Sequence, residues 1–159
     1  MGRGVVVLFA VLSAVMLAGC GISIPADPEG TLDRVSGGTM RVGVSENGRW
    51  VELDDGTGPR GVEPDLVREY ADRIDAEVEW VEGAEHELMD QLKHGQLDLV
   101  IAGLSDKTPW HSHGSITKPY AETRDERGET VKHVMAAPLG ENAFVFSVEQ
   151  FLLTKKVAL

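Results

Sequence analysis

A glycine and serine turn is the first feature of this sequence with the residue types of a catalytic site. Gly103-Leu104-Ser105-Asp106-Lys107 begins like the nucleophile elbow of α/β-hydrolases, in which a strained turn exposes the serine. Lys107 stands where the second glycine of that motif belongs. We therefore predict that Ser105 is not a nucleophile and that the protein is not an enzyme.

Histidines occur at two places with the spacing of metal ligands. His86 and Asp90 are four residues apart and would share one face of a helix, which is half of a zinc-binding pattern. No third ligand is evident, so a surface pair is the favoured interpretation. His111 and His113 flank Ser112 in a polar loop, where solvation is the default and metal capture the alternative. We expect neither a metal site nor a cofactor.

Cys20 is the only cysteine in the chain, so it can form neither an internal disulfide nor a site with several cysteines. It follows Arg3, an apolar run over Val5 to Leu17, and small residues, which is the order of a signal peptide. The apolar run is too short for a permanent membrane span. Leu17-Ala18-Gly19-Cys20 resembles the lipobox of bacterial lipoproteins, which implies cleavage before Cys20 and its acylation. An ordinary secretory signal with a chance cysteine is the alternative.

Trp50, Gly103, Ser105 and Trp110 are the residues at which we expect a ligand. Gly103 and Ser105 leave the carboxyl end of a predicted strand with little side-chain bulk, and open α/β sheets bind ligands at that end. Trp50 lies in the long polar connection 45–61. It either packs as a lid over the core edge or forms an aromatic wall for a ligand, and packing is the commoner role.

A sheet with a buried central strand must position these residues. Residues 97–101 form a nearly unbroken apolar run, which is typical of a strand covered on both faces. Strands are also predicted over 40–44 and 77–81, a helix begins near Pro64, and another covers 85–93. Because strands and helices alternate, we predict right-handed crossovers, a parallel sheet and the α/β class.

Acidic residues outnumber basic ones, with 26 Asp and Glu against 15 Lys and Arg, and the formal net charge is −11. A domain with this charge is repelled by nucleic acid and by anionic lipid headgroups. We therefore expect no nucleic-acid partner and interpret the acidity as a solubility feature.

Five short motifs occur in an order and at spacings that match one protein family. They are Met40-Arg41-Val42-Gly43-Val44, Gly61-Val62-Glu63-Pro64-Asp65-Leu66, Leu92-Lys93-His94-Gly95-Gln96-Leu97-Asp98-Leu99, Ala102-Gly103-Leu104-Ser105 and Thr117-Lys118-Pro119-Tyr120. Together they resemble the first lobe of bacterial extracellular solute-binding proteins of family 3. These are type-two periplasmic binding proteins, which deliver amino acids and similar polar solutes to ABC transporters. The resemblance implies a mostly parallel sheet flanked by helices, with antiparallel hinge-type strands near the C-terminus.

The resemblance also implies a missing lobe. In the family, a second lobe of about a hundred residues follows the Pro-Tyr motif, whereas 39 residues follow Tyr120 here. We predict a single-lobe form in which the charged connector 122–132 replaces lobe two, 133–137 is a return strand and 143–156 is the last helix. The expected organisation is a signal peptide over 1–19, a flexible tether over 20–38 with a short turn near Leu32, and one α/β domain over 39–159.

The family's first lobe pairs the α-carboxylate of its ligand with an arginine, and that arginine is replaced here. Counting without gaps from Ser105 places Trp110 at the position, and aligning Thr108-Pro109 places His111 there. Neither side chain forms the bidentate fork of arginine, and one lobe leaves half of a site open to water. We therefore expect a weakly held polar solute, or an apolar one, at Trp50, Ser105 and Trp110.

Two functions follow from these expectations. The first is a solute-binding-like, non-enzymatic protein on the extracytoplasmic face of the cell envelope, anchored to the membrane by lipid on Cys20. It would work in ABC-type uptake of amino acids or similar small polar solutes, with a transporter permease or another envelope protein as partner. The second is an interaction module that kept the lobe-one scaffold, lost its small molecule and docks a protein around Trp50, Ser105 and Trp110. A degenerate product without a role is a third.

Overall fold

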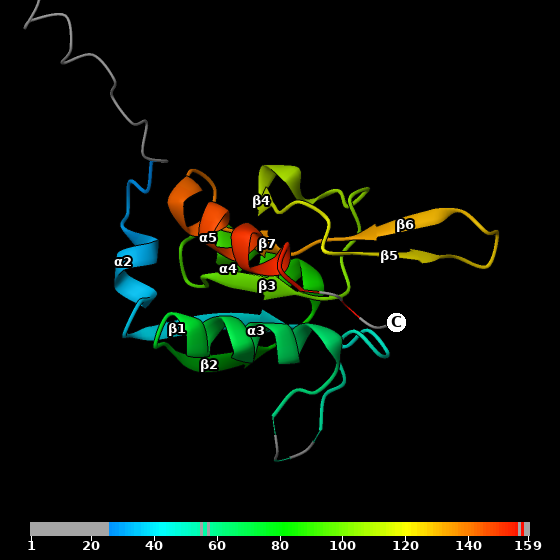
Figure 1. The fold of residues 1–159 in the computed structure, drawn as a ribbon, viewed down its shortest axis with the longest axis horizontal. Helices are drawn as coiled ribbons and strands as arrows, with labels where there is room; N and C mark the ends of the chain where they lie inside the picture. Colours follow the sequence, from blue (N-terminus) through cyan, green and yellow to red (C-terminus); the bar gives the residue numbers. More distant parts are fainter. Residues whose placement is uncertain (1–25, 55, 57, 156, 158–159) are drawn as a thin grey trace, which may run out of the picture.

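The computed structural model describes residues 26–54, 56, 58–155 and 157. In chain order, its elements are α2 (Thr31–Val35), β1 (Thr39–Val44), α3 (Val62–Arg73), β2 (Glu77–Glu82), α4 (Glu85–Lys93), β3 (Leu99–Ile101), the 3-10 helix η1 (Trp110–Ser112), β4 (Ser115–Ile116), β5 (Ala121–Arg124), β6 (Thr130–His133), β7 (Ala136–Ala137) and α5 (Asn142–Leu152). They form the α/β lobe that the sequence predicts (Figure 1).

The main sheet has five strands in the order β2-β1-β3-β7-β4. β1 runs parallel to β2 on one side and to β3 on the other, with Val42 opposite Trp80 and Leu99. β7 is antiparallel to β3 and to β4. The mostly parallel sheet, the central place of β3 and the antiparallel strands near the C-terminus are all confirmed. All three residues of β3 are buried, because helices cover both faces of this central strand.

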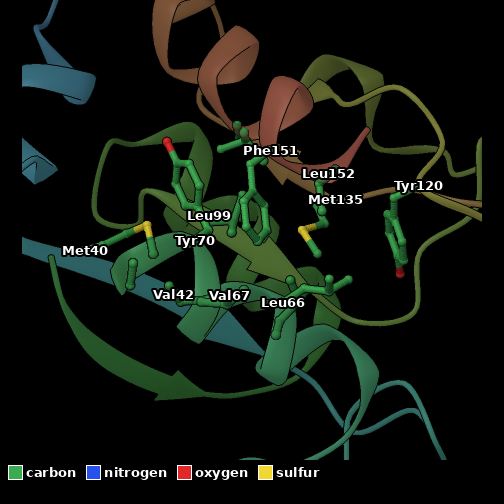
Figure 2. Packing of buried hydrophobic residues seen from close by; sticks show 14 of the residues in the cluster. Met40, Val42, Leu66, Val67, Tyr70, Leu99, Tyr120, Met135, Phe151 and Leu152 are labelled. Carbon is green, nitrogen blue, oxygen red and sulfur yellow. The ribbon is translucent and has the colours of Figure 1, made fainter. Parts of the chain in front are cut away.

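Helices cover both faces of this sheet. α3 and α5 pack over one face, where Leu99 and Ile101 join a cluster around Tyr70 (Figure 2). The Tyr70 ring lies 5.5 Å from the ring of Phe151 between centroids. α4 packs over the other face, onto Val100. Successive β3 side chains thus serve opposite clusters, as the two-residue period of a strand requires.

The helix predictions agree with the structure except at their ends. α4 has the predicted bounds, and Gly95, with φ +69°, follows it in the left-handed conformation that ends helices. α3 begins at Val62, which leaves Pro64 in the first turn, where its missing N–H costs no helical hydrogen bond. α5 ends at Leu152, before the predicted end at 156, and its apolar residues Phe144, Val148, Phe151 and Leu152 are buried.

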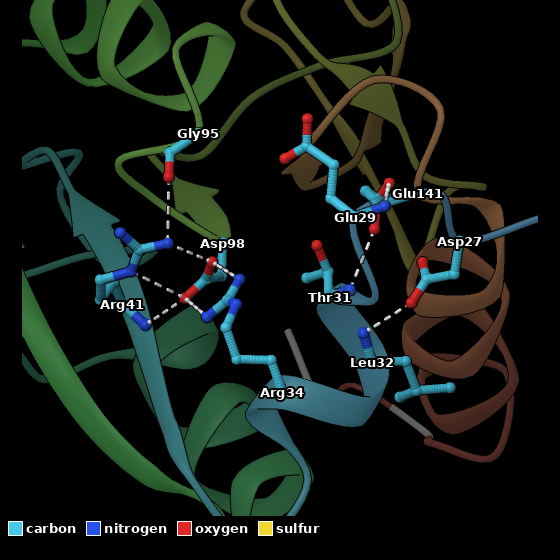
Figure 3. A network of polar contacts seen from close by, with 9 residues as sticks. All are labelled: Asp27, Glu29, Thr31, Leu32, Arg34, Arg41, Gly95, Asp98 and Glu141. Atoms are coloured by element: carbon cyan, nitrogen blue, oxygen red, sulfur yellow. Dashed lines mark hydrogen bonds and ion pairs between the residues drawn. The ribbon is translucent and has the colours of Figure 1, made fainter.

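The predicted tether is wrong for residues 29–35, although order was expected near Leu32. These residues belong to the folded body, because Glu141 accepts hydrogen bonds from the backbone N–H groups of Glu29 and Thr31, each at 3.0 Å (Figure 3). Asp27 accepts a further bond from the Leu32 N–H at 2.7 Å. These carboxylates satisfy N–H groups of the first turn of α2, because the N-cap residue, Gly30, has no side chain that could do so.

An ion cluster ties α2 to the start of β3. The Asp98 carboxylate, with 1% of its side chain exposed, lies 2.6 Å from Arg34 Nη2 and 2.8 Å from Arg41 Nη2 (Figure 3). It also accepts the backbone N–H of Arg41 at 2.8 Å. Burial alone would raise the pKa of Asp98, but the bonds from the two arginines outweigh burial and lower it.

The predicted connector forms an antiparallel hairpin of β5 and β6, with Arg124 opposite Thr130. In Figure 1 it extends away from the main sheet. The predicted return strand 133–137 is split, because β6 ends at His133 and β7 starts only at Ala136. Among the described residues, none of the helices is long and apolar enough to cross a membrane.

Candidate functional site

The loop after β3 is held in place from two sides. The N–H of Gly103 donates to Glu63 Oε2 at 2.8 Å, and Asn47 Nδ2 donates to the carbonyl of Ala102 at 2.7 Å. Gly103 has φ +61°, and a Cβ there would lie 2.6 Å from Asn47 Nδ2. The position therefore requires glycine both for its backbone conformation and for its space.

Glu63 is a fully buried acid at the first turn of α3. Its Oε1 accepts a hydrogen bond from the Tyr120 hydroxyl at 2.5 Å. Burial raises the pKa of Glu63 to about 7, although the bonds from Tyr120 and Gly103 act to lower it. Burial and the nearby Glu63 charge also raise the pKa of Tyr120. One carboxyl group thus joins the loop, α3 and the segment that enters β5.

Trp50 takes the packing role in this structure, with 7% of its surface exposed. Its ring stacks on His133 with 3.8 Å between centroids and 28° between planes. Tyr120 meets it edge-on at 6.1 Å, and the Arg49 guanidinium lies 5.3 Å from its centroid. Ligand contact by Trp50 stays a prediction, and such a ligand would meet only the small exposed part of the indole.

His133 links this aromatic cluster to the hairpin. Its Nε2 lies 2.8 Å from Thr123 Oγ1, while its buried Nδ1 has no hydrogen-bond partner among the described residues. Burial, and then the charge of Arg49, lower the pKa of His133. Both effects favour the neutral form of the ring beside Trp50.

The structure brings three of the four predicted ligand residues together. Trp50 lies against Gly103, since a Cβ there would be 3.1 Å from Trp50 Cδ1, and Ser105 bridges to His133 through the backbone. Ser105 is half-buried. Trp110 lies apart from Trp50 in the packing: it belongs with the cluster under α4, donates through Nε1 to Glu85 and meets His113 edge-on at 5.1 Å.

Sequence reasoning missed the groups that hold the loop. Glu63 has a local explanation as negative charge at a helix start, so its buried bonds to Gly103 and Tyr120 were not foreseen. His133 was expected only as the start of a strand. The Pro-Tyr motif drew attention to Tyr120, but only the fold shows what its hydroxyl meets.

The structure pairs Asp90 with a different histidine from the one that the sequence pattern offered. Asp90 lies near His94, the residue that follows α4, at 3.7 Å from Oδ2 to Nδ1. In the described part of the chain, no group of three or more His, Cys, Asp or Glu side chains is arranged to hold a metal ion. Cys20 lies outside the described residues.

The mostly parallel sheet, its flanking helices and the loop after β3 define one lobe of a type-two periplasmic binding protein. Residues 40–132, more than half of the chain, match the family model for bacterial extracellular solute-binding proteins, family 3. The chain belongs to this family. A search of curated proteins gave no match.

Solved structures with this fold include amino-acid-binding proteins. The arginine-bound form of domain 1 from TmArgBP is 19% identical, with a TM-score of 0.65, and the alignment covers 82% of this chain and all of that domain. The ancestral amino acid-binding protein AncCDT-1, a precursor of cyclohexadienyl dehydratase, is 14% identical, with a TM-score of 0.66. The alignment covers 78% of this chain and 92% of that chain. A Salmonella typhimurium periplasmic binding protein with high arginine specificity is 11% identical, with a TM-score of 0.63 and 73% and 92% covered.

These identities establish the fold of the chain. The family and these neighbours are described as binding proteins. The isolated domain 1 from TmArgBP shows in addition that one lobe of this kind is found with arginine bound.

Proposed function

We propose that this protein is a lipid-anchored, non-enzymatic solute-binding-like protein of the cell envelope that works beside an ABC-type importer of amino acids or similar small polar solutes. The observation that carries the proposal is the loop of residues 102–105. It lies at the carboxyl edge of the sheet and is held in one conformation by Glu63 and Asn47. A preformed loop at this edge is where open α/β sheets bind ligands.

The solute that fits this lobe is small, polar and weakly held. Glu63 occupies the Gly103 N–H, and Trp110 or His111 stands in place of the family arginine, so few strong donors face a carboxylate. The net charge of −11 raises the local concentration of cationic solutes. Cationic amino acids are therefore the first candidates.

Calorimetry of the purified full chain against the protein amino acids tests the ligand. We expect binding of at least one, led by arginine or lysine, and several-fold weaker binding in Ser105→Ala. Ser112→Ala, in an exposed position of the same region, is the matched control and should bind as the wild type does. Silence across the panel at millimolar concentrations would remove the ligand claim.

The anchor is tested separately. Mass spectrometry of the protein from bacterial membranes should find Cys20 acylated and residues 1–19 removed, and Cys20→Ser should release the chain into the soluble fraction. An unmodified Cys20 in membrane-purified protein would contradict the anchor.

A docking module is the second candidate, and the burial of Trp50 favours it, because His133 stacks on the aromatic face that a small ligand would use. Cross-linked capture of one envelope protein that is lost in Trp110→Ala but kept in Phe146→Ala would support docking around Trp110. Capture that is unchanged in Trp110→Ala would contradict it.

A further inference from the structure

The outer face of α5 differs from that of the other long helices. The exposed residues of α3 are Asp65, Glu69, Asp72 and Arg73, and those of α4 are His86, Glu87, Asp90 and Lys93. Every one of them is ionisable. The exposed residues of α5 and of the turn after it are Asn142, Phe146, Gln150, Leu153 and Thr154, and none is ionisable.

Exposed large apolar side chains gather at this same helix. Among the described residues they are Leu139, Phe146 and Leu153, with 51%, 48% and 59% of their surface exposed. Phe146 and Leu153 are seven positions apart and share a face of the helical path. Leu139 lies in the loop just before α5. In a chain with a net charge of −11, an uncharged apolar face of this kind is a candidate docking surface.

Charges at the sides of α5 occur in opposite pairs. Lys118 Nζ lies 3.2 Å from Glu149, and Lys155 bonds to Glu69 of α3. The rim of the face therefore adds little net charge. The exposed side chains of α3 and of α4 carry a net negative charge and are repelled by an anionic bilayer, whereas the exposed side chains of α5 carry none.

The start of the described chain is fixed to the first turn of α5. The carbonyl of Ala26 accepts the N–H of Ala143 at 3.2 Å, and Asp27 Oδ1 accepts the N–H of Phe144 at 3.3 Å. Figure 1 shows α2, which follows, beside α5. Cys20 precedes Ala26 by six residues, which span at most about 20 Å when extended. α5, with its eleven residues, is about 16 Å long.

We infer that the outer face of α5, with Phe146 and Leu153, rests on the lipid surface of the bilayer that holds the acyl chains of Cys20. The inference rests on the proposed anchor, which supplies the attachment, because two exposed side chains bind a membrane only weakly by themselves. The face sets the orientation. With α5 on the lipid, the domain lies on the membrane along the length of this helix.

Spin labelling of the acylated protein tests the orientation. Acylated Cys20 has no free thiol, so Phe146→Cys and Leu153→Cys each introduce one reactive site for a nitroxide. Glu87→Cys, on the exposed face of α4, is the matched control. In vesicles of phosphatidylethanolamine and phosphatidylglycerol, we expect several-fold more collisions with oxygen relative to a polar nickel complex at 146 and 153 than at 87. If the protein sediments with the vesicles and the ratio of oxygen to nickel collisions is the same at all three positions, the inference is overturned.

Two further outcomes separate the possible failures. If mass spectrometry finds Cys20 without acyl chains, the proposed anchor fails and the orientation inferred from it falls too. Cys20 can instead be acylated while the spectra of the labels at 146 and 153 are broadened, and dilution with unlabelled protein sharpens these spectra. In that case a second copy of the chain covers the face, and the lipid assignment is wrong. Circular dichroism of each variant shows that the fold is kept.

Discussion

The hydroxyl of Tyr120 donates to Oε1 of Glu63 across 57 positions of sequence, at 2.5 Å and in a buried setting. The other oxygen of Glu63 holds the N–H of Gly103, so one carboxyl group connects the loop after β3 to the base of the hairpin. The protonation state of Glu63 therefore affects both the stability of the domain and the hold on its loop.

The free energy of unfolding should fall as the pH rises from about 4.5 to 7. The pKa of Glu63 is about 7 in the folded chain against an ordinary value of 4.5, so over this interval the unfolded chain loses its proton and the folded chain keeps it. The loss should be on the order of 3 kcal/mol and complete above pH 7. Urea unfolding across this range measures it.

Glu63→Gln isolates this contribution, since the amide resembles the neutral acid and does not titrate. The pKa of His133 is lowered, so that residue acts in the opposite sense and destabilises the fold as the pH falls below 6.5. The difference between wild type and variant cancels this effect. Parallel pH profiles for the two proteins would show that Glu63 does not titrate as described.

Tyr120→Phe should destabilise the fold more at pH 8 than at pH 5. At low pH the variant loses a hydrogen bond to a neutral acid, at about 1 kcal/mol, whereas at high pH it leaves a buried carboxylate oxygen without its donor, at about 2–3 kcal/mol. Tyr70→Phe is the control, because Tyr70 donates to the neutral Ser147 hydroxyl at 3.0 Å. Its cost should be the same at both pH values in chemical denaturation.

Asp98→Asn should cost about 2 kcal/mol at pH 7. The substitution leaves Arg34 and Arg41 without their shared carboxylate, and their partial exposure moderates the loss. Because the folded pKa of Asp98 is lowered, its contribution is present above the ordinary value of 3.8 and disappears as the pH falls through the folded value. The difference in the free energy of unfolding between variant and wild type should therefore become smaller at acidic pH. Asp90→Asn, an exposed position, should change stability by less than about 0.5 kcal/mol.

Gly61→Ala should destabilise the domain by about 3 kcal/mol or more. Gly61 has φ +112°, and a Cβ there would lie 2.8 Å and 2.9 Å from the carbonyl oxygens of Arg49 and Trp50. Those carbonyls accept the first N–H groups of α3, so the backbone cannot move aside freely. Gly48→Ala, at φ +48° with nothing within 4 Å, should cost only about 1 kcal/mol. Similar melting temperatures for the two variants would refute this account.

Local patterns were enough to predict the strands β1 to β3 and the helices α3 and α4. α4 has the predicted bounds because its apolar period and Gly95 are signals within one segment. The alternation of strands and helices predicted the parallel strands in the same way, because a helix between two strands brings the chain back to run in the same direction. The tether failed as a prediction because its helix is completed by Glu141, far away in the chain.

By itself, the sequence determined the α/β lobe, its central strand and the loop at the end of that strand, because periodicity and glycine positions act over a few residues. Only the tertiary structure decided that Trp50 is covered by His133, that Glu63 holds Gly103 and Tyr120, and that Trp110 packs against a different cluster. Such pairs form when the folded sheet brings distant segments together and removes water from between them. No local pattern encodes which partners will meet there.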